Sequence, residues 1–281
     1  MKRIMNLVLS SFLALSLVAC GSSSTNTTTA QTNTSNVLRV GMECNYAPFN
    51  WSTTEANEFT IQFNEVDYAD GYDVIIAKRI ADALGMELEI HKMDWGNLIP
   101  GIQNGEIDLI IAGMTDTEER RESVIFTSPY YVSEEVVIVR KDGPLASITN
   151  IQEMSGYKVA GQQGTIYADI INQIEGVNKM PDGTDFPSLI NDLNHGSIDA
   201  VTSELPVAVG VTAANPDLTY VQFTKENGFA GSEVDASVSV ALAKGREDLR
   251  DQIQSVLDTI SEEERQQIML DAVNRQPAVN E

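Results

Sequence analysis

Basic residues and cysteines are scarce in this chain of 281 residues. It carries 18 Lys and Arg against 41 Asp and Glu, which gives a formal net charge of -23. Proteins that bind nucleic acid neutralise its phosphates with clustered Lys and Arg, so this shortage excludes nucleic acid as a partner. It also excludes docking on an anionic membrane through a basic patch. Two cysteines, Cys20 and Cys44, are too few for a disulfide scaffold or a cysteine zinc site.

Motifs for catalysis and for cofactor binding are missing as well. The two histidines, His91 and His195, are isolated, and neither belongs to a nucleophile motif with Ser or Cys. The chain has no HExxH, no paired Cys/His spacing, no GK[ST] loop and no GxGxxG. We therefore expect no metal, no cofactor and no enzymatic activity.

The N-terminus has the pattern of an export signal. Lys2 and Arg3 precede the mostly apolar residues 4–19, a run shorter than the ~20 residues that span a bilayer. Residues 1–19 are thus predicted to be a signal peptide, and Leu17-Val18-Ala19-Cys20 resembles a bacterial lipobox, in which the cysteine is lipidated. The alternative is a signal peptide that merely contains a cysteine.

A polar stretch follows the predicted signal. Residues 21–36 contain no large apolar side chain, so they cannot offset the entropy cost of ordering. We expect residues 20–36 to be a disordered tether, and lipidated Cys20 to anchor the exported chain to the outer face of the bacterial cytoplasmic membrane. Cys44 then has no partner for a disulfide and is expected to be a buried apolar residue.

From residue 37 onward, predicted strands and helices alternate. Repeated strand–helix units favour an α/β fold with mostly parallel sheets. Residues 52–70 are polar and are predicted to form an irregular surface excursion. Strands are predicted at 37–42, 86–90, 107–112, 135–140, 157–160, 198–202 and 237–243; helices are predicted at 72–84, 97–104, 166–174, 186–194, 246–260 and 261–275.

One internal repeat indicates the architecture. The pattern Leu98-Ile99…Ile102…Gly105-x-Ile107-Asp108 recurs 91 residues later as Leu189-Ile190…Leu193…Gly196-x-Ile198-Asp199. Two such helix–Gly–strand units predict two similar α/β lobes rather than one large sheet. Chance reuse of a common turn is the alternative.

The residues that follow the predicted strands are candidates for a site, because ligands of open α/β sheets bind beyond the carboxyl ends of the strands. Gly113-Met114-Thr115 follows one such strand and Glu204 follows another. Thr115-x-x-Glu118 fits a helix capping box. Arg120 offers a bidentate fork for a carboxylate, or else forms a surface ion pair with a neighbouring glutamate.

Three further features support a site for a small zwitterion. The glycine-rich turn 161–165 feeds a predicted helix start, an arrangement that suits a small carboxylate. Glu204 is placed to hold an ammonium group, or is an ordinary acid at a helix N-terminus. Tyr46 and Trp95 lie in loops after strands, where they either stack on a ligand or simply pack.

Several segments are similar to those of family 3 extracellular solute-binding proteins, the amino-acid receptors of ABC importers. The resemblance spans about residues 37–273 and is carried by LRVGMECNYAPF, GYDVIIAKRIADALG, IDLIIAGMTDTEERRESVIFTSPYY and IDAVTSELPVAV. It implies a type II periplasmic-binding-protein fold, with two lobes joined by two crossover strands. Lobe 1 would hold residues 37–131 plus 235–281, and lobe 2 residues 132–234.

The resemblance also implies a role for each site residue. Arg120 would hold the α-carboxylate of a free L-amino acid, and Glu204, where the family usually has Asp, would hold its ammonium group. The other implied contacts are the 113–115 loop (Gly113, Met114, Thr115), the 164–166 turn (Gly164, Thr165, Ile166), the aromatic pair Tyr46 and Trp95, and Glu43 and Gln162 at the side-chain tip.

The function implied is capture of a polar or basic L-amino acid (Arg, Lys, His or Gln) and its delivery to the permease of an ABC importer, by a monomer held at the membrane through its lipid. Two alternatives share the fold. One is an enzyme resembling a cyclohexadienyl dehydratase that acts on prephenate-like acids, and the other is a sensory lipoprotein.

Overall fold

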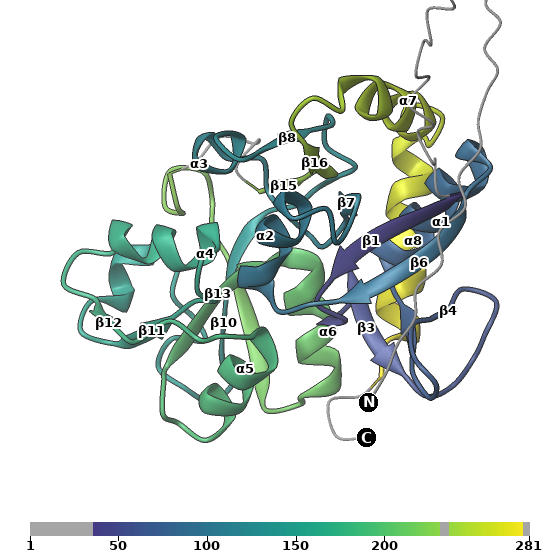
Figure 1. Ribbon diagram of the computed structural model, residues 1–281. Helices are drawn as coiled ribbons and strands as arrows, with labels where there is room; N and C mark the ends of the chain where they lie inside the picture. The colour runs from purple at the N-terminus through teal and green to yellow at the C-terminus, as the bar shows by residue number, and fades with distance from the viewer. Residues whose placement is uncertain (1–35, 231–235, 278–281) are drawn as a thin grey trace, which may run out of the picture. The chain divides into compact units, whose positions relative to one another are not determined.

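The computed structural model describes residues 36–230 and 236–277 (Figure 1). The predicted signal peptide, Cys20 and the tether up to residue 35 lie outside the described residues. Residues Ser35–Glu281 form one compact unit, with an extensive buried hydrophobic core. No helix in the described ranges has the length and apolar character needed to cross a bilayer.

The first five-stranded sheet has the order β6-β1-β7-β16-β8. Strand β1 (Val37–Met42) runs parallel to β6 (Glu87–Lys92) and β7 (Leu109–Ile110). Strand β16 (Ala241–Ala243) lies antiparallel between β7 and β8 (Val124–Phe126). Strand β16 is therefore antiparallel to the other four strands, as expected for a mostly parallel sheet.

The second five-stranded sheet repeats this plan with the order β12-β11-β13-β10-β14. Strand β11 (Lys158–Ala160) is parallel to β12 (Asn178–Lys179) and β13 (Ala200–Glu204). Strand β10 (Glu135–Arg140) lies antiparallel between β13, next to it in Figure 1, and β14 (Leu218–Gln222). The sequence repeat places α2 (Leu98–Gln103) with β7, and α5 (Phe186–Asn194) with β13, at matching positions of the two sheets.

The chain passes between the sheets twice. Strand β9 (Tyr131–Val132) connects β8 to β10 and pairs antiparallel with β15 (Ser237–Val238), which leads back to β16. The single strand predicted at 237–243 is therefore wrong, because the chain divides its pairing between this crossover ribbon and the first sheet. Between β15 and β16, the Ser239 N–H donates to the Met114 carbonyl over 2.9 Å.

The irregular surface excursion predicted at 52–70 is only partly right: residues 54–60 and 63–67 are irregular, but short strands lie between and beside them. Strands β2 (Asn45–Tyr46), β3 (Asn50–Thr53), β5 (Tyr68–Asp70) and β4 (Ile61–Gln62) form a small antiparallel sheet. These strands are too short and too polar to show a hydrophobic period. Tertiary contacts hold them, among them the buried carboxylate of Asp70, which forms an ion pair with Arg275 at 2.8 Å.

The helices follow the prediction where local signals mark their ends. Helices α1 (Tyr72–Leu84), α7 (Glu247–Leu257) and α8 (Glu262–Arg275) match closely, and Ser261 caps α8 as expected. The predicted helix at 166–174 divides into α4 (Ile166–Asp169) and the 3₁₀ helix η3 (Ile170–Gln173). Three helical elements were not predicted: α6 (Leu205–Ala214), which is apolar all round, and the 3₁₀ helices η1 (Trp95–Asn97) and η2 (Ile151–Met154). The short strands β8, β12 and β14 were not predicted either.

The helix after the 113–115 loop begins later than predicted. Helix α3 (Glu118–Arg121) is capped by Thr117, whose hydroxyl accepts a hydrogen bond from the Arg120 N–H, so the capping box predicted at Thr115 is wrong. Thr115 instead precedes the helix, and its carbonyl faces the Arg120 side chain.

Candidate functional site

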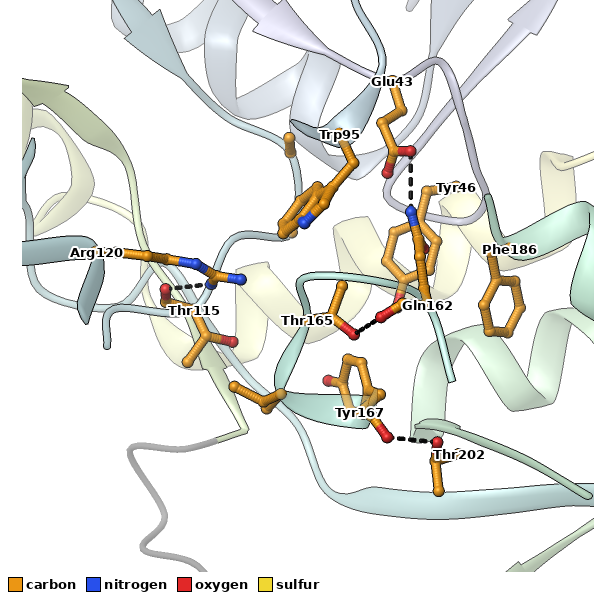
Figure 2. A pocket seen from close by; sticks show the side chains of 13 residues that line it. Glu43, Tyr46, Trp95, Thr115, Arg120, Gln162, Thr165, Tyr167, Phe186 and Thr202 are labelled. Carbon is orange, nitrogen blue, oxygen red and sulfur yellow. Dashed lines mark hydrogen bonds between the residues drawn. The ribbon is translucent and has the colours of Figure 1, made fainter. Parts of the chain in front are cut away.

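A small cavity lies where the loops of the two sheets meet, and its volume is about 20 Å³. A groove of about 1020 Å³ adjoins it and shares several of its residues. Figure 2 shows the side chains that line the cavity: Glu43, Tyr46, Trp95, Ala112, Gly113, Thr115, Arg120, Gln162, Thr165, Ile166, Tyr167, Phe186 and Thr202.

Most of the predicted site residues come together there. Nine of the twelve predicted ligand contacts line the cavity, and Met114 and Gly164 line the adjoining groove. Glu204 lines neither, although it is fully buried nearby. Among the described residues, no group of three or more His, Cys, Asp or Glu side chains is arranged to hold a metal ion.

Arg120 has backbone carbonyls as its partners. Its guanidinium donates to the Thr115 carbonyl over 2.6 Å and to the Gly164 carbonyl over 3.0 Å. It also lies over the Trp95 ring, 5.2 Å from the centroid. Burial lowers the pKa of Arg120 to about 10, so the group stays cationic at neutral pH.

Within the described ranges Arg120 forms no ion pair, so the alternative of a surface pair with a neighbouring glutamate is not observed. The adjacent Arg121 does form a surface ion pair, with Asp116. A half-buried cation without a carboxylate partner suits a ligand anion.

Glu43 and Gln162 form the second polar contact across the cavity. The Gln162 Nε2 donates to Glu43 Oε1 over 3.0 Å, as Figure 2 shows, and both side chains are buried. The pKa of Glu43 is raised to about 7, chiefly by burial and also by the nearby acids Asp185 and Asp94, while the Gln162 bond opposes the rise. Thr165 fixes the 162–165 turn, because its hydroxyl donates to the Gln162 carbonyl over 2.7 Å.

Tyr46 and Glu204 form the third contact. The Tyr46 hydroxyl donates to Glu204 Oε1 over 2.7 Å. Burial raises the pKa of Glu204 to about 8, although the hydroxyls of Tyr46, Ser133 and Tyr167 favour the ionised form. Glu204 Oε2 has no hydrogen-bond partner among the described residues. The hydroxyls of Ser133 and Tyr167 form no hydrogen bond with it. Glu204 precedes α6 but makes no capping bond to it.

Four cavity residues were not predicted: Ala112, Tyr167, Phe186 and Thr202. Phe186 meets the Tyr46 ring edge-on, with centroids 5.4 Å apart, and the Thr202 hydroxyl donates to the Tyr167 carbonyl over 2.6 Å. Ala112, Tyr167 and Thr202 adjoin predicted site residues or predicted strand ends, which is the signal that points to them. Phe186 starts a helix far along the chain, and only the tertiary fold brings it to Tyr46.

The contacts just described close the site. Four hydrogen bonds join the two sides: Tyr46 to Glu204, Gln162 to Glu43, and both Trp95 and Arg120 to the Gly164 carbonyl, the Trp95 bond being 3.0 Å. A volume of about 20 Å³ accommodates roughly one water molecule. A ligand as large as an amino acid therefore fits in this cavity only if these contacts separate or rearrange.

Several known proteins are similar to this chain in sequence and in structure. A probable histidine-binding protein of Campylobacter jejuni is 31% identical over 227 residues, which cover 80% of this chain and 82% of that protein. The arginine-binding extracellular protein ArtP of Bacillus subtilis is 28% identical over 220 residues, with coverage of 78% and 79%. The amino acid ABC transporter substrate-binding protein AbpA of Streptococcus pneumoniae, solved with L-arginine, superposes with a TM-score of 0.73 at 29% identity, covering 88% of this chain and 97% of that one.

These likenesses confirm the predicted fold of two α/β lobes with sheets flanked by helices. The model of the bacterial extracellular solute-binding proteins, family 3, matches residues 38–271. The chain belongs to this family.

Proposed function

We propose that this chain is the substrate-binding component of an ABC importer and captures a free L-amino acid between its two lobes. The observation that carries the proposal is Arg120, a cation that lines the cavity and is bonded to two carbonyls instead of a carboxylate. The relatives support the same class of ligand. One is named a probable histidine-binding protein, one is named an arginine-binding protein, and one was solved with L-arginine.

The two charged ends of an amino acid match groups on opposite sides of the site. The α-carboxylate would take the place of the carbonyl oxygens on Arg120 and accept from the N–H groups of the 164–166 turn, which opens α4. The ammonium group would reach the Gly113 carbonyl, the Thr115 hydroxyl and Glu204, whose Oε2 has no partner.

The surroundings of Glu43 favour a polar or basic side chain on the ligand. Asp94 and Asp185 lie close enough to raise the pKa of Glu43, and Glu119 and Asp169 line the adjoining groove. Of the residues that line the cavity and the groove, Arg120 alone is a Lys or Arg. An acidic side chain would meet repulsion here, so we propose Arg, Lys, His or Gln as the ligand, with the cationic ones preferred.

The rest of the assignment follows from this role. We propose lobe 1 as residues 37–131 plus 235–281 and lobe 2 as residues 132–234, which close on the ligand by bending at β9 and β15. We propose also that the chain is exported, that Cys20 carries the lipid that anchors it, and that its partners are the permease subunits of the importer. The role is binding without catalysis.

The test is calorimetry with the twenty amino acids on residues 35–281, which form one compact unit. We expect one or a few polar or basic amino acids to bind, and Arg120→Ala to lose at least about 100-fold in affinity, because it leaves the ligand carboxylate buried without a partner.

Arg121→Ala is the matched control, because it removes an adjacent, exposed arginine and should bind normally. No binding of any amino acid, or turnover of prephenate or arogenate, would refute the proposal.

A further inference from the structure

A buried hydrogen-bond network lies beneath two loops of the site. At its centre is Asp73 in the first turn of α1, which is fully buried. We propose that Asp73 is a positioning residue, which sets the backbone of the 43–46 loop and of the 113–115 loop so that their ligand contacts converge. The inference rests on the proposed function, since it concerns the same site.

One branch of the network reaches the 113–115 loop. Asp73 Oδ1 accepts from the Tyr130 hydroxyl over 2.7 Å, and the oxygen of that hydroxyl accepts from the Gly113 N–H over 3.1 Å. Gly113 has a φ of 63°, in the left-handed region. Tyr130 immediately precedes crossover strand β9, and the Tyr72 hydroxyl donates to its carbonyl over 2.9 Å. This branch therefore ties the ligand loop to the crossover.

The other branch reaches the 43–46 loop. Asp73 Oδ2 accepts from Asn50 Nδ2 over 2.8 Å, and Asn50 Oδ1 accepts from the Cys44 N–H over 2.8 Å. Cys44 has a φ of 55° and is the one non-glycine residue with positive φ in the described ranges. This backbone turn separates Glu43 from Tyr46, so the bond from Asn50 helps to set how these two side chains enter the cavity.

With an asparagine at position 50, the centre of the network requires a carboxylate. Both oxygens of Asp73 face donors, one from Tyr130 and one from Asn50, and only an acceptor-only group satisfies both. Asp73 forms no ion pair with any described residue, and burial raises its pKa to about 6. Burying a carboxylate without an ion pair is costly, and the hydrogen bonds from Tyr130 and Asn50 offset part of that cost.

The experiment exchanges the two polar groups. In Asp73→Asn, an amide N–H₂ faces the Asn50 N–H₂, so one branch of the network is broken. Adding Asn50→Asp restores every bond: the new carboxylate at position 50 accepts from Cys44 N–H and from the new amide at position 73, while that amide's oxygen still accepts from Tyr130.

Affinity is measured by calorimetry with L-arginine, L-histidine and L-glutamine on residues 35–281. We expect D73N to weaken binding about tenfold and the double variant N50D/D73N to restore it to within about threefold. Asp70→Asn is the matched control: Asp70 is equally buried and three residues away but pairs with Arg275, so D70N should melt earlier and bind normally.

A second measurement does not depend on the ligand. In residues 35–281 Cys44 is the only cysteine, and it is buried. Each variant is measured at the same temperature interval below its own melting point. We expect the Cys44 thiol to react with a disulfide reagent about tenfold faster in D73N than in the unmodified chain. In the double variant and in D70N it should react at the original rate.

Normal affinity and normal thiol reactivity in D73N would overturn the positioning role. Failure of the double variant to restore them would overturn it too. If the unmodified chain binds none of the amino acids, the proposed function fails, and the thiol rates still decide whether Asp73 positions the 43–46 loop.

Discussion

The Tyr46 hydroxyl donates to Glu204 Oε1 over 2.7 Å, which links the small sheet of the first lobe to the end of β13 in the second. The resemblance to the family leads one to expect the shorter Asp at position 204. The additional methylene gives the carboxylate the reach to accept from Tyr46, while its other oxygen has no partner among the described residues. One oxygen of Glu204 is therefore hydrogen-bonded to Tyr46, and in the proposed function the other accepts from the ligand ammonium group.

A dependence of stability on pH follows from the burial of Glu204. Burial raises its pKa in the folded state to about 8, from 4.5. The folded chain then binds a proton that the unfolded chain releases above pH 4.5, so the free energy of unfolding falls as pH rises from about 5 to 8. In the Glu204→Gln variant, we expect the free energy of unfolding to fall by about 2–3 kcal/mol less over this pH range. Urea unfolding at several pH values measures the difference.

Glu263→Gln, on the exposed surface of α8, is the control for this experiment and should keep the full slope. Equal slopes for E204Q and the unmodified chain would mean that Glu204 is already ionised in the folded state.

Local signals made part of this fold predictable. Helix α1 begins and ends where its apolar spacing and Gly85 indicate, because Gly85 takes a φ of 66° that ends the helix. The rule that ligands bind beyond strand ends indicates the loop at Gly113. Both signals lie within a few residues along the chain, so they are visible without the tertiary fold.

The missed features depend on contacts between distant residues. The strands of the small sheet are held by pairs such as Asp70 with Arg275, 205 residues apart. Phe186 reaches Tyr46 only because the second lobe faces the first. The position of Glu204 behind the cavity wall depends on the length of its side chain and on where Tyr46 lies, and no spacing in the sequence encodes that.

Release of a proton on ligand binding is expected from Glu43. Burial raises its pKa to about 7, so at pH 7 the group is about half protonated in the ligand-free chain. A cationic ligand tip favours the ionised form, and binding of L-arginine should therefore release about half a proton at pH 7. Calorimetry in buffers of different ionisation enthalpy measures this number.

Glu43→Gln should bind L-arginine at least about tenfold more weakly and release no proton from this site, while L-glutamine loses less. Glu106→Gln is the control, because Glu106 and Glu43 both line a separate surface pocket of about 590 Å³, but Glu106 is exposed. An E43Q variant that still releases the proton would assign the release to another group.

Trp95 contributes a hydrogen bond as well as an aromatic face. Its Nε1–H donates to the Gly164 carbonyl over 3.0 Å, and that carbonyl also accepts from Arg120. Trp95→Phe keeps an aromatic ring and removes the donor, so we expect about a fivefold loss of affinity, mainly through faster dissociation measured by stopped flow. Trp51→Phe changes the only other tryptophan, which lies outside the cavity, and should leave dissociation unchanged.

The close packing of Gly113 against Tyr46 leads to the last prediction. Gly113 has a φ of 63°, and a Cβ placed on it would lie 3.3 Å from Tyr46 Cε1. Gly113→Ala should therefore lose about 1–2 kcal/mol of unfolding free energy, measured by urea unfolding, and at least about tenfold in affinity, because the Tyr46 ring that lines the cavity must shift. Gly85→Ala separates the two causes: Gly85 has a φ of 66° but nothing within 4 Å of its Cβ position, so it should cost stability alone. If G85A and G113A lose equal stability and bind equally well, the contact with Tyr46 does not constrain the site.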